Sequence, residues 1–173
     1  MPLFAFEEHE PSIHPTAFIA PTAVLIGEVI VEENASIWFN VVIRADYGPI
    51  TIRAGANVQD GAVLHGGADF TEIGPGATLG HMSLVHGAKV GAETLIGNGA
   101  IVLDGARVGS RSLIAAGSTV PPNAVIPDGV MAMGTPAKVR GPLTESARHW
   151  VDDNGETYRK LAKRYSAGLR SLD

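Results

Sequence analysis

Aliphatic residues recur every six positions along most of this chain. Small residues and Gly or Asn follow them, and a repeat of six with this composition is typical of a parallel β-helix, in which each hexapeptide forms one face. The aliphatic positions are Ile13, Ile19, Leu25, Val31, Ile37, Ile43, Ile52, Val58, Leu64, Ile73, Leu79, Val85, Val90, Ile96, Val102, Val108, Ile114, Val120 and Ile126. The pattern predicts an all-β solenoid of parallel hexapeptide coils.

Three interruptions set the alignment of the coils. The steps after Ile43 and Leu64 are three residues too long, and the step after Val85 is one residue short. Three hexapeptides close one triangular coil, so residues three steps apart stack at the spacing of paired strands, about 4.8 Å. The two insertions predict short loops at 46–49 and 66–72, where functional residues are expected.

Two histidines share one column of this stack. His65 follows Leu64, and His86 follows Val85 three steps later, so the two imidazoles are predicted to lie on adjacent rungs. Arg44 occupies the same column one rung below.

His81 projects from a neighbouring face, because it comes two residues after Leu79 rather than one. Within one chain it cannot easily join the other two histidines. In a three-fold assembly of prisms, His81 of one subunit would approach His65 and His86 of the next. The repeat therefore predicts a homotrimer with a metal site shared across each subunit interface.

An imidazole site suits this composition, because the chain contains no cysteine. Catalytic zinc commonly takes three protein ligands and leaves the fourth position to water. The metal lowers the pKa of that water from 15.7 to about 7. We expect Zn²⁺, with Fe²⁺ or Co²⁺ also compatible with imidazole. The alternative is that these histidines only decorate a surface, as we expect of His9, His14 and His149.

Polar residues near the histidines are candidates for supporting roles. Asp60 stacks one rung under His81, and Arg44 can pair with Asp60 or Asp46 across subunits. Gln59 can hydrogen-bond the metal-bound water or a small-molecule substrate. The alternative for the charged residues is a purely structural ion network at the interface.

Composition and charge argue against several classes of function. Charged residues make up 18% of the 173 positions, the net charge is −5, and no basic stripe is present to neutralise nucleic-acid phosphates. Charges interrupt the apolar stretches before the roughly 18 residues that a membrane-spanning helix needs, so we expect a soluble protein. The amino terminus lacks the cationic and apolar regions of an export signal, which favours a cytoplasmic location.

One domain is predicted over residues 1–173. Residues 1–12 form an extended segment that caps the solenoid, residues 13–135 form the coils, and residues 143–170 form an amphipathic helix packed along the prism. Gly155, in the middle of this helix, is unfavourable to an unbroken helix. The apolar stripe that predicts it is Ala147, Trp150, Val151, Asn154, Tyr158, Leu161, Ala162, Tyr165 and Leu169.

Several motifs closely resemble those of the γ-class carbonic anhydrases, a family of left-handed β-helix trimers. They are Val42-Ile43-Arg44-Ala45-Asp46, Asn57-Val58-Gln59-Asp60-Gly61, Leu64-His65, Gly80-His81 and Leu84-Val85-His86-Gly87. The similarity covers nearly the whole chain, including Gly134-Thr135-Pro136-Ala137-Lys138 and the helix after it. It is this resemblance that implies the left hand of the coil, which the usual crossover rule would not predict.

The resemblance also implies roles for individual residues. The metal ligands would be His65, His86 and, from the adjacent subunit, His81. An interface salt bridge would involve the charged residues Arg44, Asp46 and Asp60. The residues implied to contact substrate or water are Gln59, Asn57 and Tyr158.

The chain departs from the fully active archetype of that family in its acidic residues. Tyr47 stands where the archetype has an acidic residue directly after the motif Asp, and the loop at 66–72 is short where the archetype has a long acidic loop. Asp69 and Glu72 are the candidate substitutes. Rapid hydration needs a route for the released proton, so we expect low turnover or other proton carriers.

Four functions are compatible with this sequence. The first is reversible hydration of CO2 to bicarbonate by metal-bound hydroxide, which would make the chain a lyase. The second is metal-dependent hydrolysis of an acyl-CoA thioester, because similar bacterial proteins occur in pathways that handle carnitine or phenylacetate. The third is a hexapeptide acyltransferase that uses histidine as a general base without metal, and the fourth is a non-catalytic scaffold. Metal content separates the first two from the others.

Overall fold

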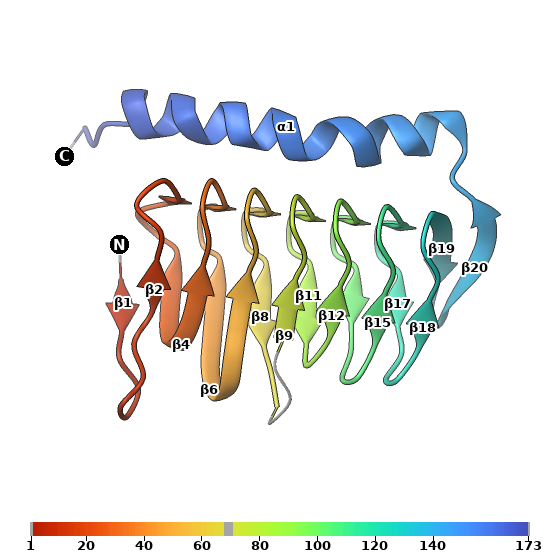
Figure 1. Ribbon diagram of the computed structural model, residues 1–173, viewed down its shortest axis with the longest axis horizontal. Helices are drawn as coiled ribbons and strands as arrows, with labels where there is room; N and C mark the ends of the chain where they lie inside the picture. Colours follow the sequence, from red (N-terminus) through yellow and green to blue (C-terminus); the bar gives the residue numbers. More distant parts are fainter. Residues whose placement is uncertain (1, 68–70, 173) are drawn as a thin grey trace.

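Short parallel strands wind into a left-handed triangular solenoid, and a single helix lies along it (Figure 1). This computed structural model describes residues 2–67 and 71–172. One face is a sheet formed by β3 (Phe18–Ile19), β5 (Ser36–Ile37), β7 (Asn57–Val58), β10 (Thr78–Leu79), β13 (Leu95–Ile96), β16 (Leu113–Ile114), β19 (Val130–Gly134) and β20 (Ala137–Pro142). The predicted all-β solenoid of parallel hexapeptide coils is confirmed.

The other two faces belong to one continuous sheet. Long strands β4 (Val24–Val31) and β6 (Val42–Ile52) run through both of them. The face that carries two of the histidines is continued by β8 (Val63–His65), β11 (Leu84–His86), β14 (Ile101–Val102) and β17 (Thr119–Val120). The remaining face is continued by β9 (Thr71–Ile73), β12 (Lys89–Val90), β15 (Arg107–Val108) and β18 (Val125–Ile126).

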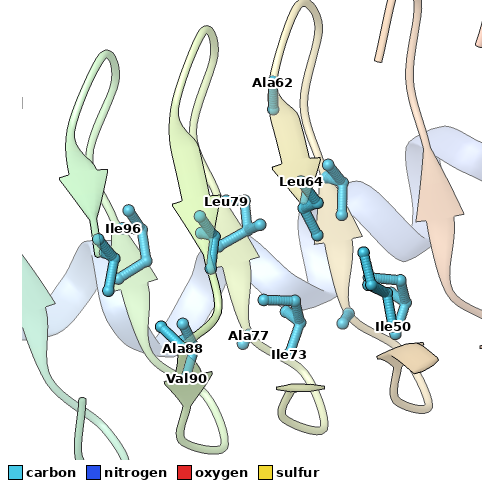
Figure 2. Packing of buried hydrophobic residues seen from close by; sticks show 14 of the residues in the cluster. Ile50, Ala62, Leu64, Ile73, Ala77, Leu79, Ala88, Val90 and Ile96 are labelled. Carbon is cyan, nitrogen blue, oxygen red and sulfur yellow. The ribbon is translucent and has the colours of Figure 1, made fainter. Parts of the chain in front are cut away.

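The repeating aliphatic residues fill the inside of the prism (Figure 2). Leu64, Leu79, Ile73 and Ile96 are fully buried, and alanines such as Ala77 occupy the narrow inner corners. Alternation along each short strand places the neighbours of these residues on the outside. The core therefore fixes which side chains face outward on each rung.

The loop predicted at 46–49 is instead part of strand β6. Strand β4 bends around the same corner beneath it, and the two strands pair on both sides of the bend with a register shift between Gly27 and Val29. Strand pairing stops after Ala45 and resumes at Ile50. The insertion is therefore a bulge within β6 and not a separate loop. Of the second insertion, residues 68–70 lie outside the described part of the chain.

Both ends of the solenoid are covered by extra strands. At the start, β1 (Leu3–Phe4) pairs with Leu25–Ile26 of β4, and β2 (Ser12–Ile13) pairs with the far end of the same strand. At the other end, β19 and β20 form an antiparallel hairpin, although the sequence predicted only that the coils stop near 135. These pairings cover strand edges that would otherwise be open.

Helix α1 (Glu145–Gly168) returns along the β3–β19 sheet, so that the chain ends at the same end of the solenoid as β1 (Figure 1). Thr144 caps it by accepting a hydrogen bond from the Ala147 amide. The helix passes unbroken through Gly155. A Cβ at this position would lie 3.0 Å from the carbonyl oxygen of Gly76. Glycine permits this close approach.

Two members of the predicted apolar stripe are exposed. Trp150 is 62% exposed and Leu169 is 45% exposed, whereas Ala147, Val151 and Ala162 pack against the solenoid. Leu169 lies beyond the last helical residue. Among the described residues, no helix combines the length and apolar character needed to span a bilayer.

We predict that Ile52→Ala lowers the free energy of unfolding by about 2–5 kcal/mol, because it leaves a cavity at a fully buried position. Val125→Ala is the matched control: Val125 is 69% exposed, and its truncation should change stability by less than about 0.5 kcal/mol. Denaturant unfolding of both variants measures the difference. Equal losses would contradict the assignment of the aliphatic repeat to the interior.

Candidate functional site

His65 and His86 stand next to each other on adjacent strands. Strand pairing aligns His65 of β8 with His86 of β11, and Arg44 of β6 with His65. The ring centroids of the two histidines lie 4.9 Å apart, and His65 Nδ1 is 3.0 Å from His86 Nε2. The predicted column of Arg44, His65 and His86 is therefore confirmed.

A carboxylate lies behind each imidazole of this pair. His65 Nε2 is 2.7 Å from Asp46 Oδ1, and His86 Nδ1 is 2.7 Å from Asp104 Oδ1. A neutral imidazole carries one N–H, and a carboxylate only accepts. When both outer nitrogens donate to the carboxylates, the inner nitrogens face each other as two lone pairs. Such a pair is stabilised only by a cation or a proton between the nitrogens.

Asp46 is held as an anion by its neighbours. It forms an ion pair with Arg44 and accepts the hydrogen bond from His65. Burial tends to raise the pKa of Asp46, but the His65 hydrogen bond and the Arg44 charge outweigh burial, so the pKa lies below its usual value. The negative charge behind His65 strengthens that imidazole as an electron donor.

His81 occupies a corner of the prism, away from this pair. Its Nδ1 lies 3.0 Å from Asp60 Oδ2, and its Nε2 lies 3.5 Å from the hydroxyl of Tyr158 on α1. Asp60 therefore pairs with His81 within the chain, while Arg44 pairs with Asp46. With Nδ1–H directed at Asp60, Nε2 carries the lone pair, which can accept from the Tyr158 hydroxyl or bind a metal ion.

Asn57 and Gln59 lie on the face of the solenoid that α1 covers, and Tyr158 lies on α1. Gln59 Nε2 donates to Asn57 Oδ1 over 3.2 Å, and Asn57 Nδ2 donates to Thr78 Oγ1 over 2.8 Å. Asn57 and Gln59 are 1% and 3% exposed, and only Gln59 of the two lines the groove beneath α1, so Asn57 positions Gln59. Burial raises the pKa of Tyr158, and the negative charge of Asp60 adds to this effect, so its hydroxyl keeps its proton.

The histidine pair fits a divalent metal. Two nitrogens bound tetrahedrally at about 2.0–2.1 Å from one zinc ion lie about 3.3 Å apart. His65 Nδ1 and His86 Nε2 are 3.0 Å apart, so a small ring rotation suffices. Within one chain, the described residues contain no group of three or more histidine or carboxylate side chains placed to hold a metal. A third ligand such as His81 would have to come from another subunit.

Sequence reasoning missed Asp104, the carboxylate behind His86. The register contained the signal: Asp104 comes two residues after Val102, on the rung directly above His86. Of the two acidic substitutes that the sequence suggested, only Glu72 lies in the described part of the chain, and it does not serve the pair. Glu72 lies on another face, bound to Arg53 over 2.6 Å, and Asp69 lies outside the described residues.

Tyr47 stands beside the histidine pair, with its ring 6.0 Å from that of His65. It is 71% exposed and supplies no carboxylate. The position that is acidic in the archetype is therefore aromatic here and borders the pair.

Comparisons with known proteins agree with this architecture. The family profile described as bacterial transferase hexapeptide (six repeats) matches residues 87–122. The carnitine operon protein CaiE of Shigella flexneri and that of Escherichia coli are each 38% identical over 170 residues, which cover 98% of this chain and 87% of theirs. The chain belongs to the hexapeptide-repeat transferase family. Within it, this chain is a relative of the CaiE proteins.

Two solved structures support the same placement within the hexapeptide-repeat family. A hexapeptide transferase family protein from Anaplasma phagocytophilum has 35% identity and a TM-score of 0.91, over 95% of this chain and 98% of that one. A Bacillus cereus protein named as a candidate acetyltransferase has 36% identity and a TM-score of 0.91, over 96% of this chain and 98% of that one.

We predict that Asp104→Asn weakens zinc binding by about 10–100-fold, because the imidazole of His86 loses its carboxylate partner. Asp153→Asn is the control, since it breaks a histidine–carboxylate pair with His149 on α1, remote from the site. Competition with a chromogenic chelator measures both affinities. Unchanged affinity in Asp104→Asn would show that this carboxylate does not support a metal ligand.

Proposed function

We propose that this protein is a homotrimeric, metal-dependent enzyme that hydrolyses acyl thioesters. The observation that carries the proposal is the pair of facing nitrogens, His65 Nδ1 and His86 Nε2, each on a ring whose other nitrogen lies 2.7 Å from a carboxylate. Histidine ligands that donate their second N–H to a carboxylate are typical of metal centres.

The trimer is supported by the outer surface beside the histidine pair. An aliphatic ladder of side chains points outward from successive rungs of the face that α1 does not cover, and Val63 in it is 38% exposed. Exposed apolar surface of this kind marks contact with another protein. The ladder consists of Val24, Val42, Val63, Leu84 and Ile101. A second subunit packed on it would come close to His65 and His86.

His65, His86 and the neighbouring subunit's copy of His81 would hold the metal. A bound Zn²⁺ or Fe²⁺ would lower the pKa of water to about 7 and so supply a nucleophile at neutral pH. In hydrolysis, the oxygen of water adds to the thioester carbonyl carbon and the C–S bond breaks. One proton of the water goes to the leaving thiol, and the other is released to solvent with the carboxylate product.

The chain's own residues orient the reactants in this reaction. Tyr158 keeps its proton and can donate a hydrogen bond to an oxygen near His81 Nε2. Gln59, whose Nε2 is occupied by Asn57, presents its carbonyl oxygen as an acceptor. Asp46, Asp60 and Asp104 fix the orientation of the three histidine rings.

Acyl substrates are favoured over CO2 by two considerations. The similar proteins carry names that refer to a carnitine operon, a transferase family and acetyl transfer. Fast CO2 hydration must also export a proton in every turnover. Tyr47 is not acidic and Glu72 is bound to Arg53, so neither position supplies that route. Thioester hydrolysis also releases one proton, but at slow turnover buffer can carry this proton away without a dedicated route.

The experiment described below also tests two other reactions. Hydration of CO2 is favoured by the match of the histidine motifs to the γ-class carbonic anhydrases. Acyl transfer without metal is favoured by the names of the two solved relatives, and in it the His86–Asp104 or His81–Asp60 pair would act as a general base.

We predict about one metal ion per subunit in protein purified without oxygen, because each of three equivalent interfaces would hold one site. Hydrolysis of a short acyl-CoA should disappear on chelation, return with Zn²⁺ or Fe²⁺, and be lost in His86→Ala. His149→Ala, which changes an exposed helix histidine, should behave as wild type. Metal analysis and parallel thioesterase and CO2 hydration assays provide the measurements.

Each contrary result points to a different reaction. CO2 hydration without thioester hydrolysis would assign the metal site to a carbonic anhydrase. Activity that survives chelation and requires an amine or hydroxyl acceptor would assign an acyltransferase. No metal and no activity on any of these substrates would contradict an enzymatic role at the histidine pair.

A further inference from the structure

Met82 combines an apolar side chain with a left-handed backbone, at a φ of +58°. It is the only apolar residue among the described non-glycine residues with positive φ. A positive φ is costly for a residue with a large side chain, whereas asparagine tolerates it better. Residues held in such conformations cluster at functional sites. The other described non-glycine residues with positive φ are Glu7, Asn34, Asn40, Glu93, Arg111 and Asn123.

Met82 stands in a column of glycines at one corner of the solenoid. Strand pairing beside this corner stacks Gly61, Met82, Gly99 and Gly117 on successive rungs. The three glycines also have positive φ, which costs glycine little. The side chain of Met82 therefore projects from this part of the corner as a single knob.

The Met82 knob is uncovered within one chain. Met82 is 75% exposed, and its Cγ lies 3.4 Å from the place that a Cβ on Gly61 would occupy. The thioether thus leans across the glycine of the coil below and gains little burial there. Glycine at position 82 would avoid the backbone cost without losing a buried contact. A contact outside the chain would explain why methionine stands here.

The surface around the knob indicates what this contact is. His81, directly before Met82, is the ligand that each subunit would give to its neighbour. Leu84, two residues after Met82, belongs to the aliphatic ladder, with Val63 and Ile101 on the adjoining rungs. The knob therefore lies between the donated histidine and the apolar surface on which a neighbouring subunit would pack.

Three-fold symmetry makes the knob and the ladder complementary. Rotation about an axis parallel to the solenoid keeps every residue at the height of its copies. Met82 belongs to the coil that carries Leu84 and His86. A subunit that delivers His81 to the next subunit's histidine pair therefore brings its Met82 to the height of Leu84. A flexible thioether adapts well to an irregular apolar surface of this kind.

We propose that Met82 locks each subunit onto the aliphatic ladder of the next, so that the partner of this corner is a second copy of the chain. The inference rests on the shared metal site of the proposed function for the placement of the subunits. It adds that an apolar contact of the following residue holds His81 at the neighbouring site. Assembly then does not depend on the metal alone.

Sedimentation velocity of the full chain over a dilution series tests this contact without turnover, both as purified and after chelation. The wild type should sediment as a trimer at concentrations where Met82→Glu, which places a carboxylate against the ladder, is dissociated. Met82→Gly should raise the concentration at which half of the trimer dissociates by about tenfold or more. Because glycine accepts a positive φ, backbone strain cannot explain weaker assembly in Met82→Gly.

Peroxide oxidation gives a second measurement on the unchanged protein. Mass spectrometry of the peptide that contains Met82 reports how fast its thioether becomes the sulfoxide. This oxidation should be about tenfold or more slower in the concentrated trimer than in the urea-unfolded chain, because the ladder of the next subunit covers the sulfur. A knob that faces solvent would be oxidised at nearly the same rate in both.

Asn34→Gly and Val125→Glu are the matched controls. Asn34 has a φ of +54° at another corner, and Val125 is 69% exposed on another face. Both variants should sediment as the wild type does, and circular dichroism verifies that every variant is folded. A trimer of Met82→Glu as stable as that of the wild type, or equal oxidation of Met82 in the trimer and the unfolded chain, would overturn the assignment.

The two proposals fail separately. A metal-loaded trimer that hydrolyses thioesters and keeps its stability in Met82→Glu would leave the proposed function standing and remove the role of Met82. A trimer that Met82→Glu dissociates, in a protein that binds no metal and hydrolyses no thioester, would retain the contact and remove the hydrolytic function.

Discussion

Parallel strand pairing at a fixed spacing is the constraint on which the rest of this structure depends. It converts a distance of twenty-one residues between His65 and His86 into a contact of 3.0 Å between ring nitrogens. The interior aliphatic residues maintain this register, because a slip of one residue would turn every buried side chain outward. The site is thus positioned by the core rather than by flexible loops.

The electrostatics of the histidine pair follow from that placement. When the carboxylates of Asp46 and Asp104 accept from the outer nitrogens of neutral His65 and His86, the inner nitrogens present two lone pairs to one small volume. A cation between the two inner nitrogens would remove the repulsion between their lone pairs. A third nitrogen from another subunit would complete the coordination of that cation. Assembly and metal binding are therefore coupled in our account, because neither the pair nor His81 forms a site alone.

Much of this architecture could be predicted from the sequence, because a repeat of six dictates both the coil and the stacking of its columns. The column of Arg44, His65 and His86 and the position of Asp60 under His81 followed from counting. Asp104 was missed because the repeat was used to align the histidines with each other, and the residues on the rung above His86 were not aligned with it.

Features that depend on packing between distant elements could not be read in the same way. The continuation of β6 through its insertion depends on β4 bending beneath it, and the exposure of Trp150 depends on how α1 rotates over the sheet. Similarly, the preference for glycine at position 155 comes from the nearby carbonyl of Gly76. Local sequence carries no information about these contacts.

The most direct test of a site shared between subunits is the activity of mixed trimers. Homotrimers of His65→Ala and of His81→Ala should both be inactive. Random co-assembly of the two variants should restore about a quarter of the wild-type sites, because one interface in four then joins an intact His65–His86 pair to an intact His81. No recovery in verified mixed trimers would contradict the shared site.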